Sequence, residues 1–176
     1  MKIKYFFKIS FAYMLIVLLA SCKLSSEKQL KNIAQLEEQI NAQSSPQEIA
    51  TLRDKYYTFV KDYPQDSLAP EMLFRVAILH LKIGHGDETI RDFDRLVNTY
   101  PNFEKNGEAC FYKAFTYDNI LHNLDSAKIA YEYFINHYPE DNLVTDAQLS
   151  LKYLGMSAEE IAATFNISDE DSLLEE

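Results

Sequence analysis

The sequence predicts an all-α protein built as a short stack of helical hairpins. Apolar residues recur three and four positions apart over successive segments, as they do on one face of an α-helix. Only four glycines occur in 176 residues, which suits packed helices better than a loop-built fold. One dipeptide recurs at offsets of 37 and 38 residues: Tyr63-Pro64, Tyr100-Pro101 and Tyr138-Pro139. A period of this size is typical of a solenoid of helical pairs.

The first 21 residues differ from the rest of the chain. Lys2, Lys4 and Lys8 form a basic flank, an apolar run follows over residues 9–20, and no acidic residue occurs. This pattern is typical of an export signal. A transmembrane helix is the alternative, but the run is shorter than the roughly 20 residues that span a bilayer.

The segment LASC at residues 19–22 resembles the lipobox of bacterial lipoproteins, in which small residues precede an acylated cysteine. The resemblance implies a signal peptide over residues 1–21, cleavage before Cys22, acyl chains such as palmitate on Cys22, and a lipidated tether over residues 22–29. Each buried methylene group adds about 0.8 kcal/mol of membrane affinity. Lys23 stands where lipoproteins of the inner membrane carry aspartate, which implies a lipid-anchored outer-membrane protein on the periplasmic face.

Charge restricts the choice of partners. Loss of the leader removes three lysines and no acidic residue, so the formal net charge changes from −10 to −13. An acidic surface repels the phosphates of nucleic acids and anionic lipid headgroups. We therefore expect no nucleic-acid partner, and membrane attachment through the lipid alone.

Helices are expected in the following order after the tether. The first covers residues 30–40, the second residues 49–63 up to Pro64, and the third runs from about Pro70 to Ile83, where Gly84 stops it. Its partner covers residues 87–100. The second helix is apolar on one face. The third is apolar almost all round, which indicates that other helices cover it on two sides.

The hairpin of the third and fourth helices repeats further along the chain. EMLFRVA at residues 71–77 corresponds to EACFYKA at residues 108–114, and both are followed by a turn, an amphipathic helix and Tyr-Pro. A last amphipathic pattern covers residues 143–154 and ends at Gly155. The spacing of Ser157 and Glu160 is that of a capping box, which begins a final short helix.

These repeats resemble tetratricopeptide repeats. The family pattern of small, bulky, aromatic and proline positions is matched by Ala77, Gly84, Phe93 and Pro101, and again by Ala114, Tyr117, Ala127, Tyr131 and Pro139. Thr89 replaces the alanine of the second helix in the first repeat, and His80 replaces the usual aromatic residue.

The motifs FVKDYPQDSLAPE and YEYFINHYPED are most similar to the BamD branch of outer-membrane assembly lipoproteins. The resemblance covers residues 47–155, although this chain is shorter, with room for two complete repeats flanked by two partial ones. It implies a short right-handed solenoid of tetratricopeptide-like hairpins over residues 30–166, followed by an acidic frayed tail over residues 167–176.

Candidate catalytic and metal-binding residues are few. The four histidines have no spacing that metal sites favour and are expected in solvated turns or in a groove: His80, His85, His122 and His137. Acidic pairs such as Glu159-Glu160 lie on one helix and do not converge. Cys110 is expected to be a buried small residue, with a reactive thiol as the less favoured alternative. We predict no metal, no cofactor and no enzymatic activity.

The function is therefore expected on a surface. In tetratricopeptide proteins the first helix of each hairpin lines a concave groove, and this register implies eight residues in a partner groove: Phe74, Ile78, Leu81, Lys82, Phe111, Phe115, Asp118 and Asn119. For Phe74 and Phe111, packing between repeats is an equal alternative. The resemblance implies a scaffold that binds other proteins, with assembly of outer-membrane proteins as the expected context. The alternatives are a coordinator of cell-wall or envelope machinery and, less favoured, a small-ligand carrier or an enzyme.

Overall fold

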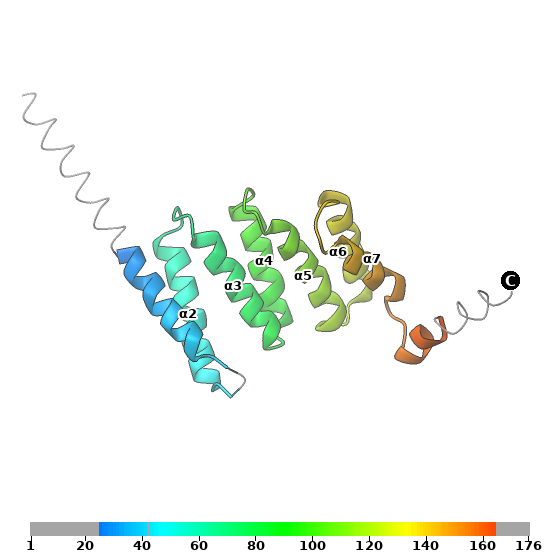
Figure 1. Ribbon diagram of the computed structural model, residues 1–176, viewed down its shortest axis with the longest axis horizontal. Helices are drawn as coiled ribbons and strands as arrows, with labels where there is room; N and C mark the ends of the chain where they lie inside the picture. The colour runs from blue at the N-terminus through cyan, green and yellow to red at the C-terminus, as the bar shows by residue number, and fades with distance from the viewer. Residues whose placement is uncertain (1–24, 42, 165–176) are drawn as a thin grey trace, which may run out of the picture. The chain divides into compact units, whose positions relative to one another are not determined.

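The structure is a computed structural model that describes residues 25–41 and 43–164. Its secondary structure over these residues is helical, and they contain no strand (Figure 1), so the predicted all-α class is confirmed. The chain divides into two compact units, Met1–Val76 and Ala77–Glu176, with the boundary inside one helix. The predicted leader, Cys22 and the tail over residues 167–176 lie outside the described residues.

The first unit contains a helix over residues 25–39, helix α2 (Pro46–Asp62) and the beginning of α3 (Ala69–Lys82). Its core consists of apolar side chains such as Ile33, Leu52 and Phe59. Residues 25–29, predicted as part of the tether, are already helical. This helix is longer than predicted, and its start contacts the corner that follows α2: the Tyr63 hydroxyl donates to Ser25 Oγ at 2.8 Å.

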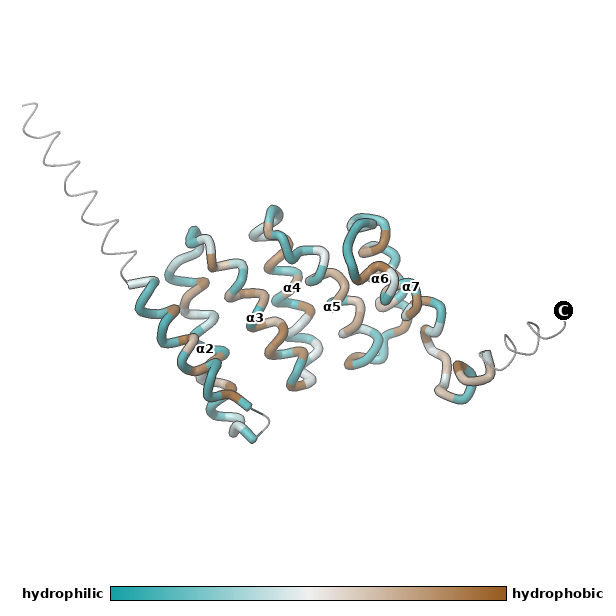
Figure 2. Tube along the Cα trace, in the orientation of Figure 1, coloured by the Kyte–Doolittle hydropathy of each residue, from teal (hydrophilic) through white to brown (hydrophobic). Residues whose placement is uncertain are grey.

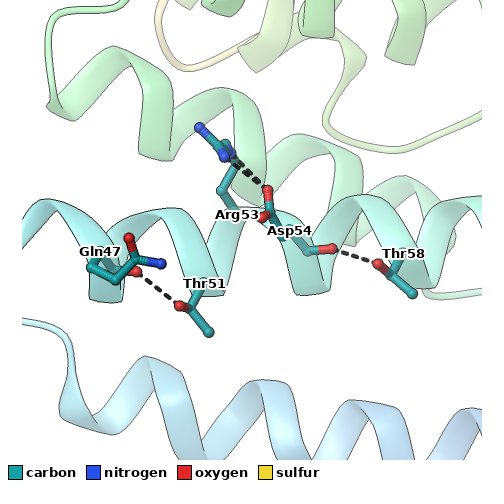
Figure 3. Close-up of polar contacts among 5 residues, drawn as sticks. All are labelled: Gln47, Thr51, Arg53, Asp54 and Thr58. Carbon is teal, nitrogen blue, oxygen red and sulfur yellow. Dashed lines mark hydrogen bonds and ion pairs between the residues drawn. The ribbon is translucent and has the colours of Figure 1, made fainter.

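Local sequence signals determine α2. Ser45 caps the helix in a reciprocal capping box with Glu48, and Pro46 occupies the first turn, where no helical N–H partner is needed. Figure 3 shows polar contacts along the helix, where Thr51 and Thr58 donate to the carbonyl groups of Gln47 and Asp54 at 2.8 and 2.7 Å. The ion pair of Arg53 with Asp54 lies in solvent and adds little stability.

The three Tyr-Pro corners have the same backbone geometry. The C-cap residues Tyr63, Tyr100 and Tyr138 have φ/ψ of −130/55°, −126/65° and −130/54°. Each donates its N–H to the carbonyl four residues earlier, at 2.8–2.9 Å. Each tyrosine carbonyl then accepts from the N–H three residues later at 3.0 Å. Proline follows each tyrosine and cannot continue the helix, so the repeated dipeptide produces a repeated corner.

The second unit contains the end of α3, then α4 (Gly86–Thr99), α5 (Asn106–Asn119), α6 (Leu124–His137) and α7 (Val144–Tyr153). From α4 onward, each helix packs against the next one in the chain (Figure 1). The helices α3 to α6 have 14 residues each, and α5 and α6 begin 37 and 38 residues after α3 and α4. Hydrophobic and hydrophilic residues are interspersed along these helices (Figure 2).

Helix α3 is buried on more than one side, as its sequence predicts: Met72, Leu73, Phe74, Val76 and Ala77 are all buried. It ends at the tight turn around Gly84, whose φ of +76° is a conformation that glycine adopts without strain.

The prediction that the histidines lie in solvated turns or in a groove is wrong for His80. Its side chain is buried, and Nδ1 lies 2.9 Å from Oδ2 of the buried Asp92 on α4. His85 stacks on the His80 ring with 6.0 Å between the ring centroids. His80 faces inward because α4 covers the end of α3, and Asp92 supplies the polar partner that a buried imidazole needs.

The core of the second unit lies between α5, α6 and α7. It contains Cys110, Phe111, Ala114, Tyr131 and Phe134. The burial of Cys110 confirms the prediction made for it. Burial also raises the pKa of its thiol, so the thiol is protonated at neutral pH and is a weak nucleophile.

The chain after α7 follows its local signals. Gly155 has a φ of +78° and ends the helix, as predicted. Ser157 and Glu160 form the predicted capping box: Ser157 N–H donates to Glu160 Oε2 at 2.7 Å, and Glu160 N–H donates to Ser157 Oγ at 3.2 Å. A short helix over residues 158–164 follows.

Candidate partner-binding surface

The eight predicted groove residues do not form one exposed patch. Phe74 belongs to the first unit, and the other seven belong to the second. Phe74 and Phe111 are only 6% and 8% exposed. Of the two interpretations given for these residues, the structure supports packing in the core.

Phe111 is buried by aromatic neighbours on α6. Its ring lies 6.0 Å from the ring of Tyr131 and 5.7 Å from that of Phe134, at tilted and edge-to-face angles. Such pairs contribute about 0.5–1.5 kcal/mol beyond their buried area. A partner cannot reach Phe111 without opening this contact.

The remaining predicted residues differ in exposure. Ile78, Leu81 and Phe115 are half-buried, whereas Lys82 and Asn119 are exposed. Asp118 and Asn119 line an open hollow of about 510 Å³ at the end of the second unit, together with Leu124 and Leu149. Burial raises the pKa of Asp118, which accepts a 3.5 Å hydrogen bond from the Tyr131 hydroxyl.

A second cavity lies on another face of α5. It has a volume of about 400 Å³ and is lined by side chains of three successive helices. We call it the α4–α6 groove. Its lining consists of Phe93, Asp94, Val97 and Asn98 of α4, Ala109, Cys110, Lys113 and Tyr117 of α5, and Ser126, Ile129, Ala130 and Tyr133 of α6. None of the eight predicted residues lines it. Its floor is apolar and buried, with Phe93, Ala109 and Cys110 among its members.

The rim of the α4–α6 groove exposes two large apolar side chains. Ile129 is 68% and Tyr133 45% exposed. The Tyr133 ring stacks on that of His137 at a centroid distance of 3.9 Å, and His137 Nδ1 lies 2.9 Å from the Tyr133 carbonyl oxygen. This stacking restricts the tyrosine ring before any partner binds.

The charged groups of the groove neutralise each other. Lys113 Nζ lies 2.5 Å from Asp94 Oδ1, which joins α5 to α4. At the floor, Cys110 is next to Tyr138, whose pKa is raised to about 12 by burial and by the neighbouring thiol. The groove therefore offers apolar contact area with a neutral polar border, and its lining holds no activated nucleophile.

Sequence reasoning missed Ile129 and Tyr133, although α6 contains a signal for them. The core stripe of this helix is Ala127, Tyr131 and Phe134. A second stripe with the same spacing runs through Ser126, Ile129, Ala130 and Tyr133, on a different face. The helix packs into the core mainly with the first of these two stripes. The second stripe leaves Ile129 and Tyr133 exposed and available for contact with another molecule.

No transmembrane candidate occurs over residues 25–41 and 43–164, because no helix there combines the necessary length with sufficient apolar character. Comparison with known proteins places the chain in no family: neither a family model nor a curated protein matches it significantly.

Proposed function

We propose that this protein is a lipid-anchored scaffold of the outer membrane that binds other proteins on its periplasmic face through a short tetratricopeptide-like stack of helical hairpins. Assembly of outer-membrane proteins is the proposed context. The lipobox-like LASC segment supports the location, and the similar Tyr-Pro corners at regular offsets support the repeat.

The single observation that carries the binding function is the exposed apolar rim of the α4–α6 groove. Ile129 and Tyr133 expose large apolar side chains beside a cavity whose floor is also apolar. Contiguous apolar surface next to a hollow is typical of protein-binding sites. The groove has its charges paired and exposes large apolar side chains at its rim, which favours a macromolecular partner over a small ligand enclosed by polar groups.

The anchor is tested by fractionation. The Cys22→Ala variant should remain unacylated and leave the membrane fraction, because the thiol that receives the lipid is lost. Unchanged membrane fractionation of the variant would exclude the lipid anchor.

The binding function is tested by co-purification. The tagged full chain, extracted from membranes in mild detergent, should retain components of the barrel-assembly machinery that an unrelated tagged outer-membrane lipoprotein does not retain. Recovery of cell-wall synthases instead would shift the context to envelope coordination, and equal recovery by both lipoproteins would contradict the scaffold.

A further inference from the structure

The acidic charge of this chain is concentrated in the second unit. Among the described residues, positions 77–164 contain 14 acidic and 7 basic residues, whereas positions 25–41 and 43–76 contain 8 acidic and 6 basic ones. The α4–α6 groove lies entirely in the acidic unit. The lining itself is neutral because Asp94 and Lys113 pair. A partner segment that approaches the groove therefore meets the negative potential of the surrounding unit, which attracts cations and repels acidic chains.

The length of the groove matches two turns of a helix. Its lining extends over residues 109–117 of α5 and 126–133 of α6, which at 1.5 Å per residue is about 12 Å. Apolar residues at positions i, i+4 and i+7 of a partner helix span about 10 Å. Two to three anchors of one helical face fit this length.

A helix suits the groove better than an extended segment. The walls are α-helices, whose backbone groups already pair within each helix, and no strand edge occurs in the described chain. An extended peptide would leave its own amide groups without backbone partners against the apolar floor, and each unpaired group costs about 1–3 kcal/mol. A helix pairs its amides internally and presents only side chains.

From these observations we infer that the α4–α6 groove binds a cationic amphipathic helix of a partner protein, with aliphatic or aromatic anchors against Ile129 and Tyr133 and with Lys or Arg residues on its flanks. The inference rests on the proposed protein-binding function and adds the chemistry of the partner. Lys113 does not repel such a helix, because Asp94 neutralises it at 2.5 Å. The His137-stacked ring of Tyr133 supplies a restricted anchor, which reduces the entropy lost on binding.

The probe is a synthetic, fluorescein-labelled helical peptide of leucine and lysine with leucines at i, i+4 and i+7. The first control peptide has the same composition with its leucines distributed around the helix, and the second has glutamate in place of lysine. Binding to the purified full chain is measured by fluorescence anisotropy at increasing salt concentration. The probe should bind tighter than both controls and should weaken as salt screens the charges.

The matched protein variants are Ile129→Gln in the groove and Leu149→Gln outside it. Both side chains are highly exposed, at 68% and 53%, so neither substitution should perturb the fold, and circular dichroism checks this. Loss of a central anchor should weaken probe binding about tenfold in Ile129→Gln. Leu149→Gln should bind like the wild type.

Two results would overturn the inference: equal binding of the probe and the redistributed peptide, or equal effects of the two substitutions. These failures are distinguishable from failure of the proposed function. If Ile129→Gln leaves probe binding unchanged while the full chain still co-purifies with envelope proteins, the scaffold stands and the groove assignment is wrong. If the probe binds as expected and no envelope protein co-purifies, the groove assignment stands and the scaffold function is wrong.

Discussion

The His80 imidazole and the Asp92 carboxylate form a buried pair that joins the end of α3 to α4, with Nδ1 and Oδ2 2.9 Å apart. Removing one member leaves the other polar group buried with a poorer set of partners. We expect Asp92→Ala to lower the free energy of unfolding by about 1–3 kcal/mol, the cost of a buried polar group that loses a hydrogen-bond partner. Urea denaturation followed by circular dichroism measures this change.

A double-mutant cycle separates the pair from simple packing. His80→Phe replaces the imidazole with a ring that needs no carboxylate partner. Asp92→Ala should therefore cost less in this background, with a coupling of at least about 1 kcal/mol. Additive effects would show that the two side chains do not stabilise each other.

Gly107 is predicted to be intolerant of a side chain. A Cβ at this position would lie 2.5 Å from Asp141 Oδ2 and 3.1 Å from Tyr138 Cδ1. Asp141 cannot move freely, since its Oδ1 accepts a 3.0 Å hydrogen bond from the Leu143 N–H at the corner before α7. Gly107→Ala should therefore lower the free energy of unfolding by about 1–3 kcal/mol.

The control for this prediction is Gly107→Ala combined with Asp141→Ala. If steric overlap with the carboxylate is the cause, the alanine at position 107 should cost less in the Asp141→Ala background. Urea denaturation followed by circular dichroism measures the cost of Gly107→Ala in both backgrounds. An equal cost in the two backgrounds would show that overlap with the Asp141 carboxylate is not the cause.

Phe111 and Phe115 should respond differently to truncation, although both were candidates for the groove, Phe111 with core packing as an equal alternative. Phe111 is buried against Tyr131 and Phe134, so Phe111→Ala should cost about 3–5 kcal/mol. Phe115 is half-buried, and Phe115→Ala should cost less than half as much. Comparable losses in urea denaturation would show that Phe115 is also a core residue.

The stability of the second unit should fall at alkaline pH. Burial raises the pKa of Tyr131 to about 12, and that of Tyr138 to about 12, from an ordinary value of 10. Between these values the folded chain keeps phenolic protons that the unfolded chain loses, so the free energy of unfolding decreases as pH rises from 10 towards 12. Below pH 10 this contribution is fully present.

Urea titrations at several pH values test this slope, and tyrosinate absorbance reports ionisation on unfolding. Tyr131→Phe should reduce the slope, because this variant lacks one of the two phenols whose pKa is raised in the folded chain. A slope that is identical in wild type and Tyr131→Phe would contradict the role of this phenol.

Much of the fold was predictable because its signals are local. The corners at Tyr63, Tyr100 and Tyr138 follow from proline after an apolar stripe, and the ends at Gly84 and Gly155 follow from positive φ. The capping box at Ser157 needs only residues three positions apart. Such features depend on backbone chemistry within one turn, so the sequence carries them without knowledge of the neighbours.

The surface was less predictable, as four residues show. His80 appeared to be a solvated polar residue and is buried with Asp92, and Phe111 appeared equally suited to a groove and to the core. Ile129 and Tyr133 drew no attention, although they form the exposed rim of the α4–α6 groove. In each case the outcome depends on which face of a helix its neighbours cover.

By itself the sequence determined the all-α class, most helix C-termini, the repeated Tyr-Pro corners and the acidic composition, because these are properties of short stretches or of composition. The starts of the first helix and of α2 were not determined in this way. Tertiary structure alone decided which apolar face is core and which is exposed. The reason is that α5 and α6 each have more than one apolar stripe, and packing buries only those that meet a neighbouring helix. The candidate site is the apolar surface that this packing leaves open.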